Sequence, residues 1–268
     1  MSGARTLAPF GRRLAEVTAV ERIGAYALLC ALDADGPADP APGQFYMVAA
    51  AERWGAGADE RPFLPRAFSF ARAWPRPGGG AALDFLMEDV GPGTERLIAL
   101  GEGEGLWLTG PLGIGFAEPE HGRPLLVGGG IGVAPLLCWQ DRLGRDAEVL
   151  VGFRSAQHAE AAGLFAGEPR LATDDGSAGR HGLVTDLLAE ELDTDARATV
   201  YACGPPAMLE AVRVLCAGRS VPCQLALESG MACGYGACFG CVVPTREGYV
   251  RLCVDGPVLA GAALEVVA

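Results

Sequence analysis

The chain has 268 residues, half of them hydrophobic, and a formal net charge of −12. That length suffices for two domains with cores of their own, and the acidic balance disfavours nucleic acid and anionic membrane surfaces as partners. The apolar runs are strand-sized and fall short of the roughly 20 residues of a membrane helix, and the first residues lack the apolar core of a signal peptide, so we expect a soluble, cytoplasmic protein with no membrane partner.

The first 118 residues are expected to form short strands separated by turns rich in glycine and proline. The strands are expected at Leu14–Arg22, Ala25–Leu32, Gln44–Ala49, Arg66–Ala71, Leu83–Met87 and Gly105–Thr109, with one helix at Thr94–Leu100. Many short strands with such punctuation are typical of an antiparallel β-barrel, which we assign to residues 1–118.

Two motifs in this half indicate a flavin. Residues 66–69 fit Arg-x-[Tyr/Phe]-[Ser/Thr], so Arg66 would meet a flavin diphosphate while Phe68 and Ser69 approach the isoalloxazine. By itself this tetrad is explained equally well as an ordinary barrel strand with an exposed arginine.

The second motif opens the expected helix. Gly91, Gly93 and Thr94 would present helix N–H groups to phosphate, although a turn and N-cap without a ligand would have the same pattern. The two motifs together, in this order, favour a flavin site.

After His121 strands and helices alternate. A buried strand begins at Pro124, and further strands are expected at Glu148–Phe153 and from Thr199 to Gly204. The helices are expected at Ala134–Leu143, Thr185–Glu191 and Pro206–Ala217. This alternation predicts a parallel α/β sheet, which we assign to residues 119–222 as a nicotinamide domain.

Two strand-to-helix junctions of this domain carry dinucleotide-type turns. In the first, glycines at a tight turn let a pyrophosphate approach the backbone, although the pattern is not G-x-G-x-x-G. Its residues are Gly128, Gly129, Gly130, Gly132, Ala134 and Pro135. The second is Cys203-Gly-Pro-Pro-Ala-Met, at a strand's carboxyl end, where ligands bind in open α/β sheets; its expected contacts are Cys203, Gly204, Pro205 and Met208. A core thiol is the alternative for Cys203, but the Gly-Pro that follows favours an exposed turn.

Four cysteines near the C-terminus have the spacing C-x4-C-x2-C-x11-C: Cys233, Cys238, Cys241 and Cys253. This is the plant-type [2Fe–2S] ligand pattern, and the small residues between them let the backbone wrap closely around a cluster. A zinc site or a set of buried thiols is the alternative, but zinc prefers two short pairs. We assign residues 223–268 to this cluster segment.

The motifs together resemble the ferredoxin–NADP reductase superfamily. Arg-x-Phe-Ser, Gly-x-Gly-Thr, Gly-Pro-Leu-Gly-x-Gly-Phe at 110–116, GGGxGxAP and CGPxxM occur in that order. With the C-terminal cysteines, and a Thr-Asp-Asp-Gly-Ser stretch at 173–177, the chain is most similar to the family of electron-transfer subunits of class 1B dihydroorotate dehydrogenase. A departure is Ala67, where the family usually has proline.

The resemblance implies an oxidoreductase subunit of pyrimidine biosynthesis that binds FAD, a [2Fe–2S] cluster and NAD. Its partner would be an FMN-containing catalytic subunit, in a heterotetramer of two copies of each. Electrons from dihydroorotate would pass from that FMN through the cluster and FAD to NAD⁺. The flavin contacts would also include Ala67, Leu86, Met87 and Glu88, the last an unexpected acid near phosphates.

No catalytic acid or base is expected in this chain, since His121, His158 and His181 are scattered in loop-like contexts typical of surface histidines. Three alternatives remain open. One is a sister subunit with another partner, such as a sulfide dehydrogenase or an electron-bifurcating NADH:ferredoxin reductase. Another is a stand-alone NAD(P)H reductase. The third is a non-enzymatic, cluster-bearing redox sensor.

The choice of nicotinamide depends on the segment after the second parallel strand. Arg154 with Ser155 would provide a clamp for the 2′-phosphate of NADP. It is a single basic residue, however, and acidic Glu160 and Glu168 come before the next one. With the resemblance, this favours NAD over NADP.

Overall fold

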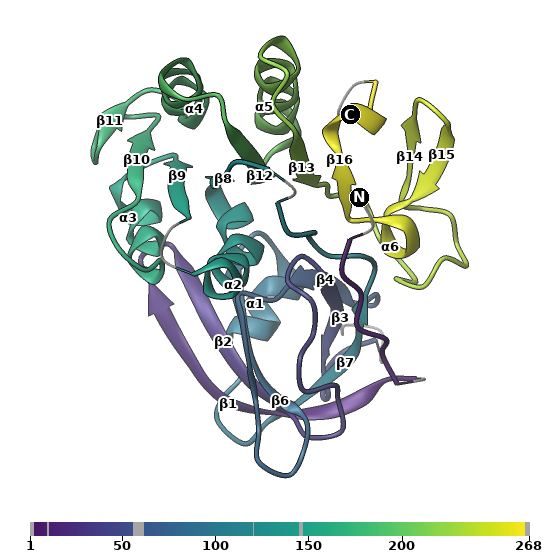
Figure 1. Ribbon diagram of the computed structural model, residues 1–268. Helices are drawn as coiled ribbons and strands as arrows, with labels where there is room; N and C mark the ends of the chain where they lie inside the picture. The colour runs from purple at the N-terminus through teal and green to yellow at the C-terminus, as the bar shows by residue number, and fades with distance from the viewer. Residues whose placement is uncertain (1–2, 10, 56–61, 120, 145–146, 266–268) are drawn as a thin grey trace.

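The computed structural model describes residues 3–9, 11–55, 62–119, 121–144 and 147–265. Within them lie two seven-stranded sheets and a two-stranded hairpin. The first sheet forms the lower half of the molecule in Figure 1, the second the upper half, and the hairpin stands beside the second sheet.

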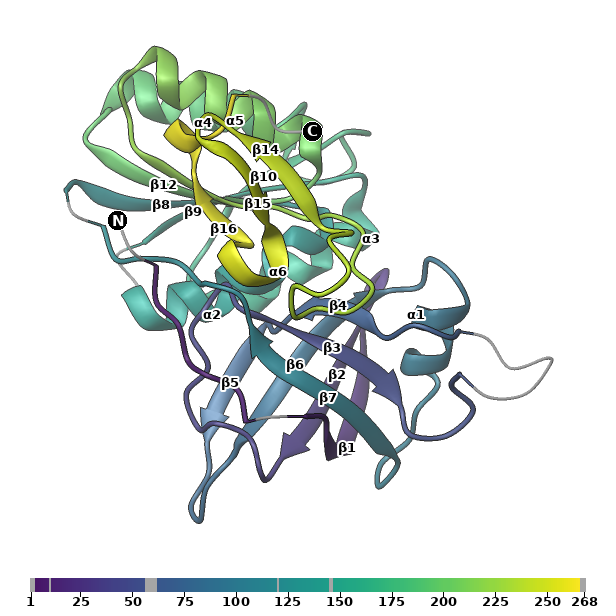
Figure 2. The same ribbon diagram turned by 90° about the vertical axis from the view of Figure 1, so that its right-hand side faces the viewer.

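The first sheet is antiparallel throughout and has the order β4-β3-β7-β1-β2-β6-β5. Its strands are β1 (Arg13–Ile23), β2 (Tyr26–Asp33), β3 (Phe45–Ala50), β4 (Arg66–Ser69), β5 (Arg72–Pro75), β6 (Ala81–Glu88) and β7 (Gly105–Leu112), and helix α1 is Pro92–Ile98. The sheet curls around its own core (Figure 2), so the predicted antiparallel barrel is confirmed. The expected strand at 66–71 ends at Ser69, and the buried Phe70 and Ala71 connect β4 to β5.

Alternating burial along the strands explains the barrel core. In β1 buried and exposed residues alternate from Arg13 to Glu16, as expected for a strand with one face inward. The rings of Phe70 and Phe85 meet Tyr46 edge to face with centroids 6.1 and 5.8 Å away. Aromatic pairs of this kind add about 0.5–1.5 kcal/mol beyond the burial of their area.

The second sheet has the order β11-β10-β9-β8-β12-β13-β16. Its strands are β8 (Arg123–Gly129), β9 (Glu148–Phe153), β10 (Arg170–Thr173), β11 (Arg180–His181), β12 (Ala198–Cys203), β13 (Cys223–Ala226) and β16 (Val258–Ala260). The first six are parallel, which confirms the predicted α/β sheet, and β16 adds an antiparallel edge strand next to β13.

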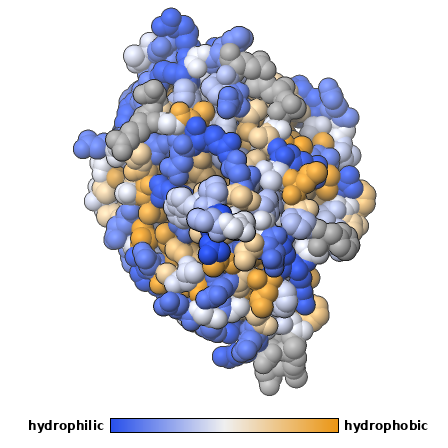
Figure 3. Space-filling model, turned by 60° about the horizontal axis from the view of Figure 1, so that its bottom comes forward, coloured by the Kyte–Doolittle hydropathy of each residue, from blue (hydrophilic) through white to orange (hydrophobic). Residues whose placement is uncertain are grey.

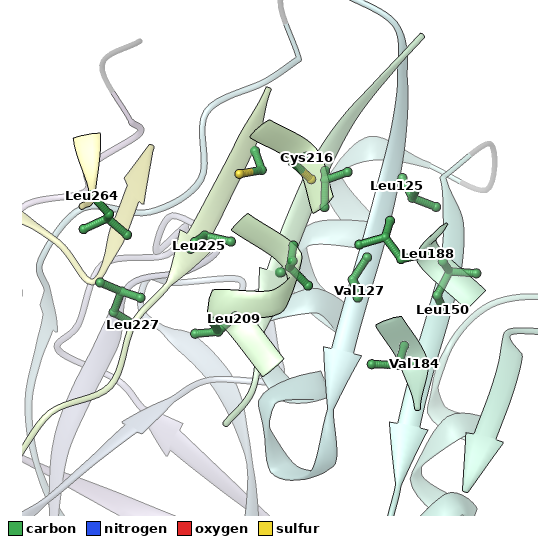
Figure 4. Packing of buried hydrophobic residues seen from close by; sticks show 14 of the residues in the cluster. Leu125, Val127, Leu150, Val184, Leu188, Leu209, Cys216, Leu225, Leu227 and Leu264 are labelled. Carbon is green, nitrogen blue, oxygen red and sulfur yellow. The ribbon is translucent and has the colours of Figure 1, made fainter. Parts of the chain in front are cut away.

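Helices cover both faces of this sheet. They are α2 (Ala134–Leu143), preceded by the short helix η1 (Gly130–Val133), then α3 (Ala156–Ala159), η2 (Glu160–Leu164), α4 (Val184–Thr194) and α5 (Pro206–Gly218). Helices α4 and α5 pack on one face, where Leu188 and Leu209 meet Val127 and Leu225 of the strands (Figure 4). Helices α2 and α3 cover the other face, which is turned toward the barrel (Figure 2).

The C-terminal segment leaves the second sheet after β13 and returns to it as β16. Between them come a loop, the hairpin of β14 (Val242–Thr245) and β15 (Gly248–Arg251), and α6 (Leu252–Asp255); η3 (Gly261–Ala263) follows β16. The loop lies against the barrel, because a Cβ placed on Gly234 would be 2.5 Å from Met47 Cγ. The segment therefore touches both sheets.

The surface at the barrel end mixes hydrophilic residues with scattered hydrophobic ones (Figure 3). Within the described ranges no helix is both long and apolar enough to cross a membrane.

Candidate functional site

A pocket opens where the barrel, the second sheet and the C-terminal segment meet. Four residues expected around a flavin line it, Ala67, Phe68, Ser69 and Leu86, together with two from the predicted dinucleotide turn, Ala134 and Pro135. Its other walls are Phe45, Ile131, Leu227, Glu228, Ser229, Met231 and Pro257. Apolar and aromatic walls with a few polar groups suit the flat, largely apolar ring of a flavin.

Arg66 lies next to this pocket, against the first turn of α1. A Cβ placed on Gly93 would be 2.6 Å from Arg66 Nε, so glycine is what lets the guanidinium lie there. The guanidinium also stands 5.7 Å from the ring of Trp54, whose buried indole N–H has no acceptor among the described residues. A charged fork beside a helix N-terminus fits a diphosphate. Trp54 was not expected here, since no motif contains it.

The hydroxyl of Thr94 is engaged within the turn. It accepts from Val90 N at 2.9 Å and donates to Gly91 O at 2.9 Å. Gly91 is the N-cap residue of α1, and no described atom lies within 4 Å of where its Cβ would stand. A phosphate at this turn would therefore be bound by backbone N–H groups, while Thr94 holds the turn in shape.

Two expected contacts are not made by side chains. Met87 is fully buried in the barrel core, because β6 alternates and Leu86 takes the face toward the pocket. Cys203 was expected in an exposed turn, but this is wrong: its side chain is 2% exposed and packs among the core residues beneath α2. Burial raises the pKa of the Cys203 thiol well above its usual value, so the thiol stays protonated.

A second cavity, of about 570 Å³, lies at the carboxyl ends of β8, β9, β10 and β12. The predicted glycine-turn residues Gly129, Gly130, Gly132, Gly204, Pro205 and Met208 line it. Tyr26, Glu88 and Val90 close it from the barrel side, and Asp174, Val184 and Thr185 from the far end of the sheet. The volume falls within the range of about 300–1,000 Å³ usual for small-molecule sites.

The glycines of the two turns serve different purposes. A Cβ on Gly132 would be 2.5 Å from the Cys203 carbonyl oxygen, and one on Gly204 would be 3.1 Å from Gly129 Cα. These glycines allow the two turns to pack on each other. Gly130 is different, with φ +55° and Tyr26 Oη at 3.8 Å as its nearest neighbour, so it is the glycine that leaves room for a ligand.

Arg154 follows β9 and reaches across the cavity to the barrel. Its guanidinium forms an ion pair with Glu88 and contacts His158 Nε2 at 2.9 Å. His158 Nδ1 is 2.9 Å from Ser155 Oγ, and its ring meets that of Tyr26 edge-on at 5.6 Å. His158 is therefore part of this constellation and not a free surface histidine.

Glu228 lies at the boundary of the two cavities and lines both of them, as does Ile131. It lies two residues after β13, at the same sheet edge as the glycine turns. Its residue surface is exposed, but the cavity walls around the carboxyl desolvate it in part and raise its pKa above the usual value. Glu228 was missed because no motif includes it; its place just after a parallel strand was the available indication.

The four predicted cluster cysteines lie beside the first pocket. No three His, Cys, Asp or Glu side chains among the described residues are gathered closely enough to hold a metal ion. The thiols instead approach in pairs: Cys241 Sγ and Cys253 Sγ are 3.2 Å apart, and Cys233 Sγ accepts from the Cys238 side chain as well as from Cys238 N at 3.4 Å. Two pairs of thiols fit a [2Fe–2S] cluster, in which each iron takes two of the four thiolates.

The loop backbone points N–H groups at sulfur. Burial raises the pKa of Cys233, but N–H groups of Cys238, Tyr235 and Ala237 outweigh it and lower the value to about 6. Phe239 adopts φ +57°, which is unusual for a residue with a side chain, and Arg251 stands 5.2 Å from its ring. No sequence motif indicates this strained position.

The three sites lie in a row. Glu228 and Ile131 are shared by the two cavities, and Met231, two residues before the first cluster cysteine, lines the pocket beside the barrel. Phe45 faces the same pocket and belongs to the hydrophobic cluster that contains Cys241 and Cys253. A ligand in the middle pocket is thus next to both the large cavity and the cysteines.

Comparisons with known proteins agree with this arrangement. The family model described as "Iron-sulfur cluster binding domain of dihydroorotate dehydrogenase B" matches residues 228–265, and "Oxidoreductase NAD-binding domain" matches residues 170–214. The "Dihydroorotate dehydrogenase B (NAD(+)), electron transfer subunit" of Geobacillus thermodenitrificans is 41% identical over 229 residues, covering 81% of this chain and 84% of the relative. A protein of the same description from Caldanaerobacter subterraneus subsp. tengcongensis is 37% identical over 227 residues, covering 82% and 85%.

Among solved structures, the NADH-dependent reduced ferredoxin-NADP oxidoreductase, studied for flavin-based electron bifurcation, is similar with a TM-score of 0.78 at 24% identity. The match covers 96% of this chain and 92% of that one. At that identity the likeness shows a common fold.

Proposed function

The chain belongs to the family of electron-transfer subunits of NAD-dependent dihydroorotate dehydrogenase B, and from this we propose that it relays electrons between an FMN-containing catalytic partner and NAD⁺. Dihydroorotate would be oxidised on the partner, and the electrons would leave as NADH from this chain. This is the task of an oxidoreductase subunit in pyrimidine biosynthesis. We propose the cytoplasm as its location, where thiols stay reduced.

The observation that carries the proposal is the row of three sites. The large cavity suits a nicotinamide dinucleotide, the middle pocket a flavin, and the paired cysteines a cluster. FAD and a [2Fe–2S] cluster, when bound, supply the conversion between two-electron hydride transfer and one-electron transfer. Contact between neighbouring sites, through Glu228 on one side and Met231 on the other, keeps each transfer short.

The residues have separate tasks in this scheme. Arg66 and the first turn of α1 would hold the flavin diphosphate, while Phe68 and Ser69 would orient the ring. Gly130 would leave room for the dinucleotide. We propose no catalytic acid or base for dihydroorotate on this chain. That chemistry belongs to the partner.

We propose that the functional units follow the predicted bounds, with residues 1–118 for FAD, 119–222 for NAD and 223–268 for the cluster. The last two units share a sheet, because β13 pairs with β12. The cluster unit is thereby fixed to the nicotinamide unit, while its loop lies on the barrel at Gly234.

The face around the cluster loop is proposed to meet the FMN subunit, in an assembly of two copies of each chain. Tyr235, Phe239 and Tyr249 are 65%, 63% and 79% exposed on this segment. Exposed aromatic side chains are typical anchors of protein interfaces. An interface built on these residues would bring the cluster close to a partner's flavin.

The experiment measures NAD⁺ reduction by dihydroorotate with the full chain alone, with the FMN subunit, and with a Tyr235→Ala/Phe239→Ala chain. Cluster absorbance is recorded for each protein, and Val214→Ala, a change at an exposed position on α5, is the matched control. We expect no turnover from the chain alone, full turnover from the complex, and at least tenfold weaker assembly for the double variant with its cluster retained. Turnover of dihydroorotate by the isolated chain at the rate of the complex would refute the relay.

A further inference from the structure

An ion pair joins the flavin barrel to the nicotinamide domain across the large cavity. Glu88 is the last residue of β6, and Arg154 is the first after β9, so the two are 66 positions apart in sequence. Both line the cavity, and the Glu88 side chain is 23% exposed against 64% for Arg154. Among the described residues Arg154 is the only lysine or arginine that lines the cavity, and Glu88 already pairs with it.

Contacts between the barrel and the nicotinamide domain hold the Glu88–Arg154 pair in place. Ala25 N donates to Gln157 O at 3.1 Å, which ties the β1–β2 turn to α3. Tyr26 contacts the His158 ring, and His158 in turn contacts both Arg154 and Ser155. Arg154 is therefore held toward the barrel by His158 of the short helix that follows it as well as by Glu88.

The balance of charge in the cavity is acidic. Its charged lining residues are Glu88, Asp174 and Glu228 against Arg154 alone. In dinucleotide folds an arginine near the end of the second strand accommodates a 2′-phosphate, whereas an acidic residue accepts a hydrogen bond from the free 2′-hydroxyl. Here the arginine is present at that strand end, but its charge is already paired.

We propose that Glu88, supplied by the flavin barrel, is the residue that makes this site select NAD(H) over NADP(H). It neutralises Arg154 and adds a negative charge that repels a 2′-phosphate. Nucleotide selectivity is thereby set by the domain that binds the flavin and not by the dinucleotide domain alone. The inference rests on the proposed nicotinamide site in this cavity.

The test compares Glu88→Gln, which keeps shape and removes charge, with the double variant Glu88→Gln/Arg154→Ala. The control is Glu168→Gln, which removes one negative charge at an exposed position away from the cavity lining. The FAD-loaded full chain is titrated calorimetrically with NAD⁺ and with NADP⁺, so that binding is measured without turnover. The ratio of kcat/KM for NADH and NADPH with ferricyanide is then measured on the same preparations. Glu88→Ala replaces Glu88→Gln if the latter does not fold.

We expect Glu88→Gln to lower the ratio Kd(NADP⁺)/Kd(NAD⁺) at least tenfold, and the effect to shrink at high salt because it is a charge interaction. The double variant should return toward the wild-type ratio, since the gain requires Arg154, and Glu168→Gln should match wild type. An unchanged ratio in Glu88→Gln, or an equal fall in the double variant, overturns the inference while leaving the relay intact. Failure of the wild-type chain to bind either nucleotide would instead overturn the proposed function, and this inference with it.

Discussion

Alanine substitutions at Gly130 and Gly132 should separate a glycine that a ligand needs from one that the fold needs. At Gly132 a Cβ would be 2.5 Å from the Cys203 carbonyl oxygen and 2.6 Å from Gly204 N, both backbone atoms of the facing turn. At Gly130 nothing lies closer than Tyr26 Oη at 3.8 Å, but φ is +55°. The two positions differ in what an added methyl group meets.

The expected magnitudes follow from these contacts. Overpacking usually costs about 1–3 kcal/mol, and Gly132→Ala should reach the upper end because backbone atoms cannot rotate away. A left-handed conformation costs a non-glycine residue about 1–2 kcal/mol, partly offset by about 0.4–1 kcal/mol of lost chain entropy in the unfolded state. Gly130→Ala should therefore cost about 1 kcal/mol, yet its methyl group would enter the cavity.

The assay is thermal unfolding of the FAD-loaded chain together with calorimetric titration of NAD⁺. At about 2–4 °C per kcal/mol, Gly132→Ala should lower Tm by about 6–12 °C and Gly130→Ala by about 2–4 °C. Gly130→Ala should nevertheless show the larger loss of NAD⁺ affinity per degree of Tm lost. Equal Tm changes in the two variants, or normal NAD⁺ affinity in Gly130→Ala, would refute this reasoning.

Three further predictions concern the cluster, the barrel core and pH. Cys238→Ser should lose iron and sulfide but keep FAD and most NADH-to-dye activity, and equal loss of both would show that the sites are not separable. Asp33→Asn should destabilise the barrel by about 3–5 kcal/mol in urea unfolding, because Arg13, bonded to Asp33 at 2.6 Å, would stay charged and buried; a loss below about 1 kcal/mol would contradict this. Burial raises the pKa of Asp84, so the protonated carboxyl favours folding, and this stabilisation is lost as pH rises above about 4. Asp84→Asn should remove that part of the pH dependence of the unfolding free energy. Parallel curves of stability against pH for the two proteins would argue against it.

The sequence predicted those features that are formed by residues close together in the chain. Turns rich in glycine and proline marked the strands of the barrel, and the run of apolar residues before Gly128 marked the parallel strand β8. The spacing of the cysteines brought Cys233 and Cys238 together on one loop, because that part of the cluster site is local.

Features that depend on distant packing could not be predicted. Cys203 turns inward because β12 is a central strand with helices on both faces. The Gly-Pro pair that follows Cys203 does not predict this burial. The pairing of Glu88 with Arg154 depends on the interface between the two domains, which no local sequence pattern predicts. The antiparallel edge strand β16 likewise follows from the return of the chain past the cluster loop.

The central claim is that electrons from the FMN partner enter through the cysteine loop and leave at the cavity beside Gly130. It is tested most directly by NAD⁺ reduction with dihydroorotate in two reconstituted complexes, one with the wild-type chain and one with Cys238→Ser. Assembly and FAD content are measured for both. The account predicts that the Cys238→Ser complex assembles, binds FAD, and loses at least 100-fold in dihydroorotate-dependent NAD⁺ reduction, which corresponds to about 2.7 kcal/mol. Turnover at the wild-type rate without a cluster would contradict it.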